Sequence, residues 1–270
     1  TYSRAASCMS GRGEFLFLAH RIPYPPDKGD KIRSWRFLEL LARRYPVHLA
    51  AFVDDPADFM HETFLQSLCA SVTLIPLNPA QARARSAVSL LRGEPLTFGY
   101  YRDARMRRAV DAVRRRPLAG EFAFSSSMAP YLEPPAPGRL RVADLCDADS
   151  EKWREYAASA SFPMNIVYAR EHRRLADAET AIINGFDAAL AISDAEAAVL
   201  SSRPGLQRSL TVVGNGVDTD YFAPGDFSRP ADAGDIVFTG AMDYRPNVEA
   251  ARWFATDVLP LVRVKLSDTR

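Results

Sequence analysis

Residues 14–41 read EFLFLAHRIPYPPDKGDKIRSWRFLELL, and this stretch decides the fold class. An apolar run over Glu14–Ala19 ends at His20, and three prolines then stiffen the connection. A continuous apolar run is typical of a parallel strand that is covered on both faces. From Asp30 to Arg44 the apolar residues recur at three- and four-residue spacing, which predicts an amphipathic helix. The stretch therefore predicts a strand, a loop and a helix in that order.

The same pattern recurs along the chain. Further strands are predicted at Val47–Val53, Ser71–Leu77, Phe122–Ser125, Leu140–Leu145, Ala188–Ile192 and Leu210–Val213. Helical patterns separate them, one running from about Pro163 to Asn184-Gly185 and one beginning after Ser193, which has capping-box spacing to Glu196. Repeated strand–helix units predict an α/β fold, a Rossmann-like doubly wound parallel sheet.

Composition shifts divide the chain into four parts. Residues 1–12 lack periodicity and predict a disordered tail, and residues 13–222 form the first α/β domain. Residues 223–234 are rich in Pro, Gly and Asp and predict a linker, after which residues 235–270 restart with a strand and a helix. One strand and one helix cannot bury a core of their own, so they either pack on the first domain or begin a truncated second one.

Composition and motifs exclude several classes of protein. The 270 residues carry a net charge of only +1, which argues against a nucleic-acid-binding protein. The three scattered cysteines suggest buried thiols, and no apolar run approaches the roughly 20 residues of a membrane span. The sequence has no secretory h-region, no GxGxxG, P-loop or GxSxG motif, and no metal-ligand spacing among its histidines. We therefore expect no metal and no bound cofactor.

In an open α/β sheet, ligands bind beyond the carboxyl ends of the strands, so those loops hold the candidate residues. After the first strand, Gly29 permits close backbone approach and Asp30 can cap the helix. Together with Lys31, the helix start suits a phosphate or carboxylate. An ordinary strand–helix loop with a good cap is the alternative. Of the four histidines, only His20 is placed near a site.

Polar residues also follow two later strands. Ser126 and Ser127 can hydrogen-bond a sugar or phosphate, or simply cap a helix. Asp147 and Asp149 can act as a general base, hydroxyl ligands or metal ligands, although a cap again competes for Asp149. Three acidic residues within five positions exceed what one cap needs, which favours a functional role.

The segment TVVGNGVDTDYF follows the last predicted strand of the first domain. Its Gly-Asn-Gly turn has no suitable partner strand behind it, so a hairpin is disfavoured. Asn215 and Asp218 are predicted to lie on a binding loop.

A basic stretch stands apart from these loops. Between Gln81 and Arg116 there are ten arginines and three acidic residues, a local net charge of +7. Within Arg102–Arg116 a narrow apolar stripe of Met106, Val110 and Val113 is flanked by arginines. Such a helix can rest on an anionic membrane surface, or be an ordinary solvated helix.

Four segments in this order resemble the family-four glycosyltransferases of the two-Rossmann (GT-B) architecture: RIPYPPDKGDKIR, DADSEKW, NGVDTDYF and FTGAMDYRPN. The first two are most similar to the exosortase-associated (PEP-CTERM) glycosyltransferases of exopolysaccharide synthesis. The resemblance implies retaining transfer from a nucleotide sugar, without an essential metal, to a glycan or lipid-linked acceptor. It also implies a cytoplasmic enzyme, peripheral on the inner face of the plasma membrane.

The resemblance assigns roles to individual residues. It places Gly29, Asp30 and Lys31 near the donor diphosphate and acceptor, and Gly240 near the donor phosphates. Asp147 and Asp149 are the expected catalytic residues, and Ser126, Ser127, Asn215 and Asp218 are expected to bind substrate.

The late part of the donor domain that the family uses to hold the nucleotide sugar has no counterpart before Arg270. We therefore expect little or no transferase activity from this polypeptide alone. A non-catalytic acceptor-binding or membrane-docking module is the alternative. An unrelated nucleotide-binding α/β enzyme is a third hypothesis, and the missing phosphate-binding motifs count against it.

Overall fold

The computed structural model describes residues 13–223, 235–240, 242, 245–267 and 269. By compactness the chain divides into two units, Thr1–Gly216 and Val217–Arg270. The predicted tail at 1–12 lies outside the described residues, as does all of the predicted linker except residue 223.

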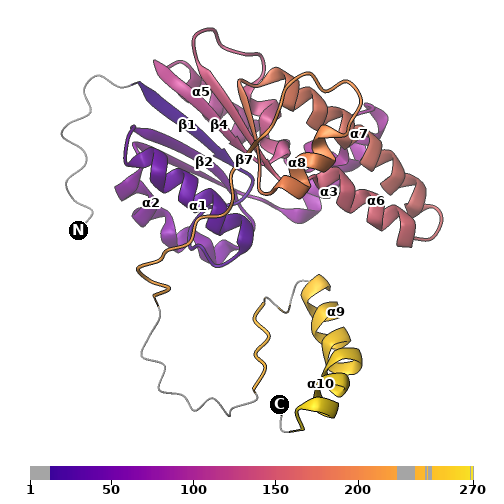
Figure 1. Cartoon of the computed structure of the whole chain (residues 1–270). Coiled ribbons are helices and arrows are strands. Elements are labelled where there is room, and N and C mark those ends of the chain that lie inside the picture. Colours follow the sequence, from indigo (N-terminus) through magenta and orange to yellow (C-terminus); the bar gives the residue numbers. More distant parts are fainter. Residues whose placement is uncertain (1–12, 224–234, 241, 243–244, 268, 270) are drawn as a thin grey trace. The chain divides into compact units, whose positions relative to one another are not determined.

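The first unit is built on a seven-stranded sheet in which every strand pair is parallel, in the order β3-β2-β1-β4-β5-β6-β7 (Figure 1). The seven predicted strands are confirmed, and the first two match residue for residue. The strands are β1 Glu14–Ala19, β2 Val47–Val53, β3 Ser71–Pro76, β4 Leu118–Phe124, β5 Leu140–Cys146, β6 Ala188–Ala191 and β7 Thr211–Val212.

Strand β4 begins four residues before its predicted start at Phe122. Gly120 and Glu121 interrupt the apolar run, so the pattern of apolar residues does not predict this part of the strand. Glu121 is fully buried and is neutralised by Arg114 at 2.9 Å and Arg139 at 3.1 Å. The charge is therefore compatible with a strand interior that periodicity alone would exclude.

Helices cover both faces of the sheet. On one side lie α1 Gly29–Ala42 and α2 Glu62–Leu68, joined to β2 by the 3-10 helix η1 Pro56–His61. On the other lie α3 Pro79–Leu91, α4 Leu96–Tyr100, α5 Ala104–Arg114, the 3-10 helix η2 Ser126–Leu132, α7 Met164–Gly185 and α8 Asp194–Ser201, and α6 Asp149–Ser159 packs on α7. None of the helices in the described ranges is long and apolar enough to span a bilayer.

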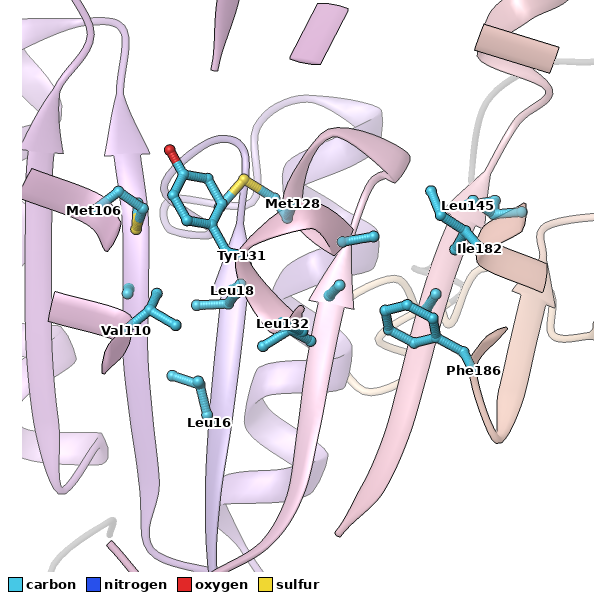
Figure 2. Close-up of a cluster of buried hydrophobic side chains, with 14 of the residues drawn as sticks. Leu16, Leu18, Met106, Val110, Met128, Tyr131, Leu132, Leu145, Ile182 and Phe186 are labelled. Atoms are coloured by element: carbon cyan, nitrogen blue, oxygen red, sulfur yellow. The ribbon is translucent and has the colours of Figure 1, made fainter. Parts of the chain in front are cut away.

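The two faces of β1 feed two hydrophobic clusters. Phe15 and Phe17 pack with α1 and α2, whereas Leu16 and Leu18 point the other way. Figure 2 shows Leu16 and Leu18 among side chains from α5 and η2. This alternation with a period of two explains why β1 is apolar at almost every position.

Helix α1 contains a buried charged side chain that the periodicity does not predict, Arg33. Trp35 and Leu38 are buried as the periodicity predicts, but Leu40, another apolar residue of the same predicted helix, is 48% exposed. Arg33 is 1% exposed and makes two parallel hydrogen bonds to Asp144 of β5, at 2.8 and 3.1 Å. The same guanidinium donates to the Val213 carbonyl oxygen at 2.6 Å. A helix on one face of the sheet is thereby tied to two of its strand ends.

The second unit contains α9 Arg245–Trp253, the π-helical segment η3 Phe254–Val258 and α10 Leu259–Lys265. A helix lies where one was predicted, whereas the described residues show no strand at the start of this part. Residues 235–240 have no strand pairing with the described chain, and Val237 is 77% exposed. A strand needs a hydrogen-bonding neighbour, so a strand at this position stays a prediction.

Replacing Asp144 by Asn would leave the Arg33 charge buried without its counter-ion. We expect the free energy of unfolding to fall by about 3–5 kcal/mol, as for other buried pairs that lose one partner. Denaturant unfolding measures it. The matched control is Glu94→Gln, which breaks the exposed pair with Arg102 and should change stability by less than about 1 kcal/mol. Equal effects of the two substitutions would contradict the structural role of Arg33.

Candidate functional site

The strand order reverses direction between β1 and β4, and the carboxyl ends of these strands are where an open parallel sheet binds ligands. Polar side chains from the ends of β1, β2, β4 and β5 and from the start of α1 gather at this edge, together with one tyrosine. We call them the switch-point cluster: His20, Arg21, Asp30, Asp54, Tyr101, Ser126 and Asp149.

A chain of charges runs through the β1 side of the cluster. Arg21 lies between two carboxylates, 2.8 Å from Asp30 and 2.9 Å from Asp54. Asp30 also lies 3.4 Å from Nε2 of His20. Burial acts to raise the pKa of Asp30, but the hydrogen bond from His20 and the nearby charges outweigh it, so the pKa lies well below its ordinary value. Asp30 is therefore a stable anion that orients both neighbours.

His20 is the central side chain of the cluster. Its ring stacks on Phe124 and meets Tyr101 edge-on, with both centroids 5.8 Å away. Its Nδ1 atom is buried and makes no hydrogen bond to any described residue. With the other nitrogen facing Asp30, Nδ1 is the ring nitrogen that lacks a partner, and it is closed to solvent in this structure. A carboxylate that orients an imidazole in this way is a recurring arrangement for general-base chemistry.

Tyr101 connects His20 to the acidic side of the cluster. Burial raises the pKa of Tyr101 above its ordinary value, and the charges of Asp149 and Asp54 add to the rise. The phenol therefore stays protonated at neutral pH and can serve as a hydrogen-bond donor.

The two predicted catalytic aspartates differ in their surroundings. Asp149 accepts a hydrogen bond from the Ser126 hydroxyl at 3.4 Å and one from Lys152 at 2.9 Å. Asp147 is about half-exposed and lies 3.6 Å from the same lysine. The structure thus places Asp149 in the cluster with Ser126, and Asp147 beside it on the exposed side.

The amides at the start of α6 are bound by residues that lie far away in the sequence, and not by a local capping side chain. The cap position of α6 is Ala148, whose amide donates to Glu196 at 2.8 Å. The Ser150 amide donates to Glu179 at 3.2 Å. Neither Asp149 nor Ser150 caps α6 with its side chain, so the Asp149 carboxylate is left to its contacts with Ser126 and Lys152.

Two neighbouring strands leave the sheet through strained residues. Ser125, after β4, has φ of 80°, and Cys146, at the end of β5, has φ of 60°. Non-glycine residues in this region cost about 1–3 kcal/mol each and gather at functional sites. The sharp exits direct η2 and α6 toward the same edge of the sheet.

The first predicted loop is organised differently from expectation. Asp30 does not occupy the cap position of α1; Lys28 does, without a side-chain cap bond, because Asp30 turns toward His20 and Arg21. Lys31 is buried and its ammonium lies 2.8 Å from Asp58. Gly29 is exposed, and a Cβ added there would meet nothing within 4 Å. The open part of this loop is therefore the backbone around Gly29.

The other predicted binding residues are spread over both units. Ser127 is buried and its hydroxyl bonds to that of Ser125 at 2.9 Å, while the Asn215 amide oxygen accepts from Arg33 at 3.2 Å. Asp218 and Gly240 belong to the second unit. Asp218 accepts from the Tyr221 amide at 3.0 Å, and a Cβ added at Gly240 would approach Asn247 within 2.9 Å.

The apolar stripe predicted on α5 faces the sheet rather than the surface. Met106 and Val110 are fully buried against the sheet, as Figure 2 shows, so the helix cannot insert them into a bilayer while it stays packed. Its arginines are largely engaged: Arg107 donates to the Pro130 carbonyl at 2.6 Å and Arg114 pairs with Glu121. The stripe is the core-facing side of an ordinary covering helix.

Sequence reasoning missed three members of the cluster. Asp54 directly follows β2, and Arg21 directly follows His20, so their positions at strand ends were the available signal. Tyr101 lies after a short helix, and no local pattern distinguishes it. Among the described residues, no group of three or more His, Cys, Asp or Glu side chains is arranged to hold a metal ion.

Comparison with known proteins adds no family assignment: no protein-family model and no curated protein matches this chain. The site is therefore interpreted from its own geometry.

The depressed pKa of Asp30 predicts a specific acid sensitivity. Its ionised form stabilises the fold above the unfolded-state value of 3.8, and that contribution is lost as the pH falls below it toward the folded-state pKa. Denaturant unfolding near pH 6 and near pH 3 should show a smaller loss of stability for Asp30→Asn than for wild type. Asp111→Asn, at a half-exposed carboxylate on α5, should retain the wild-type loss.

Proposed function

We propose that this chain carries the acceptor half of a glycosyltransferase that uses a nucleotide-sugar donor, with retention of configuration. The observation that supports it is the switch-point cluster, above all the buried and unpaired Nδ1 of His20 with Asp30 behind the ring. Such a cluster of imidazole, carboxylate, phenol and hydroxyl groups is suited to binding sugar hydroxyls. The four segments that resemble family-four glycosyltransferases supply the reaction class.

Sugar transfer needs an acceptor hydroxyl that is held in place and whose proton is accepted. In the proposal, His20 and Asp149 bind the acceptor hydroxyls, Tyr101 donates a hydrogen bond, and Ser126 orients Asp149. Asp147, half-exposed beside them, contacts the outer part of the acceptor.

The transfer also releases a nucleoside diphosphate, whose charge must be stabilised. Helix α1 has 14 residues and a cap position without a side-chain bond. The Gly29 and Asp30 amides donate to no described residue, so the positive end of the helix is open around Gly29. Backbone amides at a helix start bind phosphate without a dedicated motif. We assign the donor diphosphate to this position.

The proposed substrates are a nucleotide sugar and a glycan or lipid-linked acceptor, on the cytoplasmic side of a membrane. The alternative, an acceptor-binding module without transfer chemistry, uses the same cluster. It differs in needing no donor. Donor and acceptor must therefore be tested separately.

Saturation-transfer NMR of the whole chain tests the proposal, with UDP-glucose, GDP-mannose and dTDP-rhamnose as donors and short exopolysaccharide fragments as acceptors. We expect at least one acceptor to bind with a Kd between about 1 µM and 1 mM, the usual range for enzyme substrates. His20→Ala and Asp149→Asn should weaken acceptor binding at least about tenfold, because each removes a buried or partly buried hydrogen-bond partner.

His61→Ala and Asp111→Asn are the matched controls, since both lie outside the cluster, and both should bind as wild type. Binding of an acceptor but of no nucleotide sugar would favour the acceptor-binding module. If no saccharide binds, or if the cluster variants bind as wild type, the proposal is wrong.

A further inference from the structure

Helix α3 is amphipathic, but its apolar side faces outward. Ala82 and Ser89 are fully buried on the inner side. On the opposite side, Leu91 is 91% and Val88 is 46% exposed. Helical spacing places these outward positions in one stripe: Ala80, Ala84, Ala87, Val88 and Leu91. The usual pattern of a covering helix, with polar residues outside, is reversed over this stripe.

The start of α7 extends the stripe. Arg170 donates to the carbonyl oxygens of Leu90 at 3.3 Å and Glu94 at 3.2 Å, so α7 lies beside the end of α3, as Figure 1 also shows. Ile166 precedes Arg170 by one turn on the same face of α7 and is 58% exposed. We call this area the α3 surface: Ala84, Ala87, Val88, Leu91 and Ile166.

Three exposed arginines flank the α3 surface. Helix α3 contains no acidic residue. Arg83 and Arg92 flank the stripe, and Arg173 follows Ile166 two turns along α7; all three are exposed and pair with none of the described residues. The arginines of α5, by contrast, are largely occupied by carboxylates and carbonyl oxygens.

We propose that the α3 surface docks on a membrane that contains anionic phospholipids. An apolar stripe bordered by unpaired arginines matches the bilayer interface, where alkyl groups reach the acyl boundary and guanidinium groups meet the lipid phosphates. A second copy is a poorer occupant, because a two-fold interface would place two surfaces that are both bordered by arginines against each other. The proposal stands independently of the sugar-transfer function.

Co-sedimentation of the whole chain with vesicles tests the docking. Wild type should bind phosphatidylcholine vesicles that contain phosphatidylglycerol, should not bind pure phosphatidylcholine, and should be released as salt rises to about 0.5 M. In the double variant Arg83→Gln/Arg92→Gln, the loss of each arginine should weaken vesicle binding about fivefold, because each basic residue near an anionic membrane contributes about 1 kcal/mol. Val88→Ser/Leu91→Ser should weaken it about tenfold.

Two control variants separate the α3 surface from general effects of charge and hydrophobicity. Arg108→Gln/Arg115→Gln removes the same charge from the region of α5, and Met60→Ser removes an apolar side chain that is 77% exposed on η1. Both should bind as wild type. All substituted side chains are exposed, so circular dichroism should show an unchanged fold.

Three results would overturn the proposal. The first is the absence of wild-type binding to anionic vesicles at low salt. The second is a control variant that loses as much binding as the α3 variants. The third is a dimer in light scattering that Val88→Ser/Leu91→Ser dissociates, which would assign the surface to a second copy of the chain.

Discussion

The buried ion pair between Arg33 and Asp144 is the contact on which the geometry of the site depends. It joins the first turns of α1 to β5, and through the Val213 carbonyl and the Asn215 side chain it also reaches the chain beyond β7. Asp30 lies one turn before Arg33 on the same helix, so fixing Arg33 also fixes the carboxylate that orients His20. If one of the two residues is removed, the charge of the other stays buried without a partner, which is strongly destabilising.

Acidic residues from distant helices also organise the site. Glu171 of α7 accepts from the Leu96 and Thr97 amides and so holds the start of α4, which precedes Tyr101. Glu179 and Glu196 do the same for the start of α6. In each case a carboxylate from a distant helix satisfies amides that a local cap residue would otherwise satisfy. The local acid Asp149 is thereby left for the switch-point cluster.

The helices α3 and α5 show why a periodic pattern does not by itself identify a surface. Both carry an apolar stripe and nearby arginines, and the sequence left α5 open as either a membrane-facing or an ordinary solvated helix. In the fold, the α5 stripe covers the sheet, whereas α3 buries its alanine and serine side and leaves its larger apolar side outside. Periodicity reports that a helix has two sides, and only the neighbouring elements decide which of them meets solvent.

The sequence by itself determined the strand–helix order, the seven strands, and the loops after the strands on which the site lies. These features follow from local signals: continuous apolar runs for covered strands, and polar residues directly after them.

The tertiary structure decided the partners of each side chain. Lys31 was expected at an open site and lies in a buried pair with Asp58, while Tyr101 meets the His20 ring without any local signal in the sequence. Backbone conformation is largely a local property, whereas contacts between residues far apart in the chain exist only once the sheet has assembled.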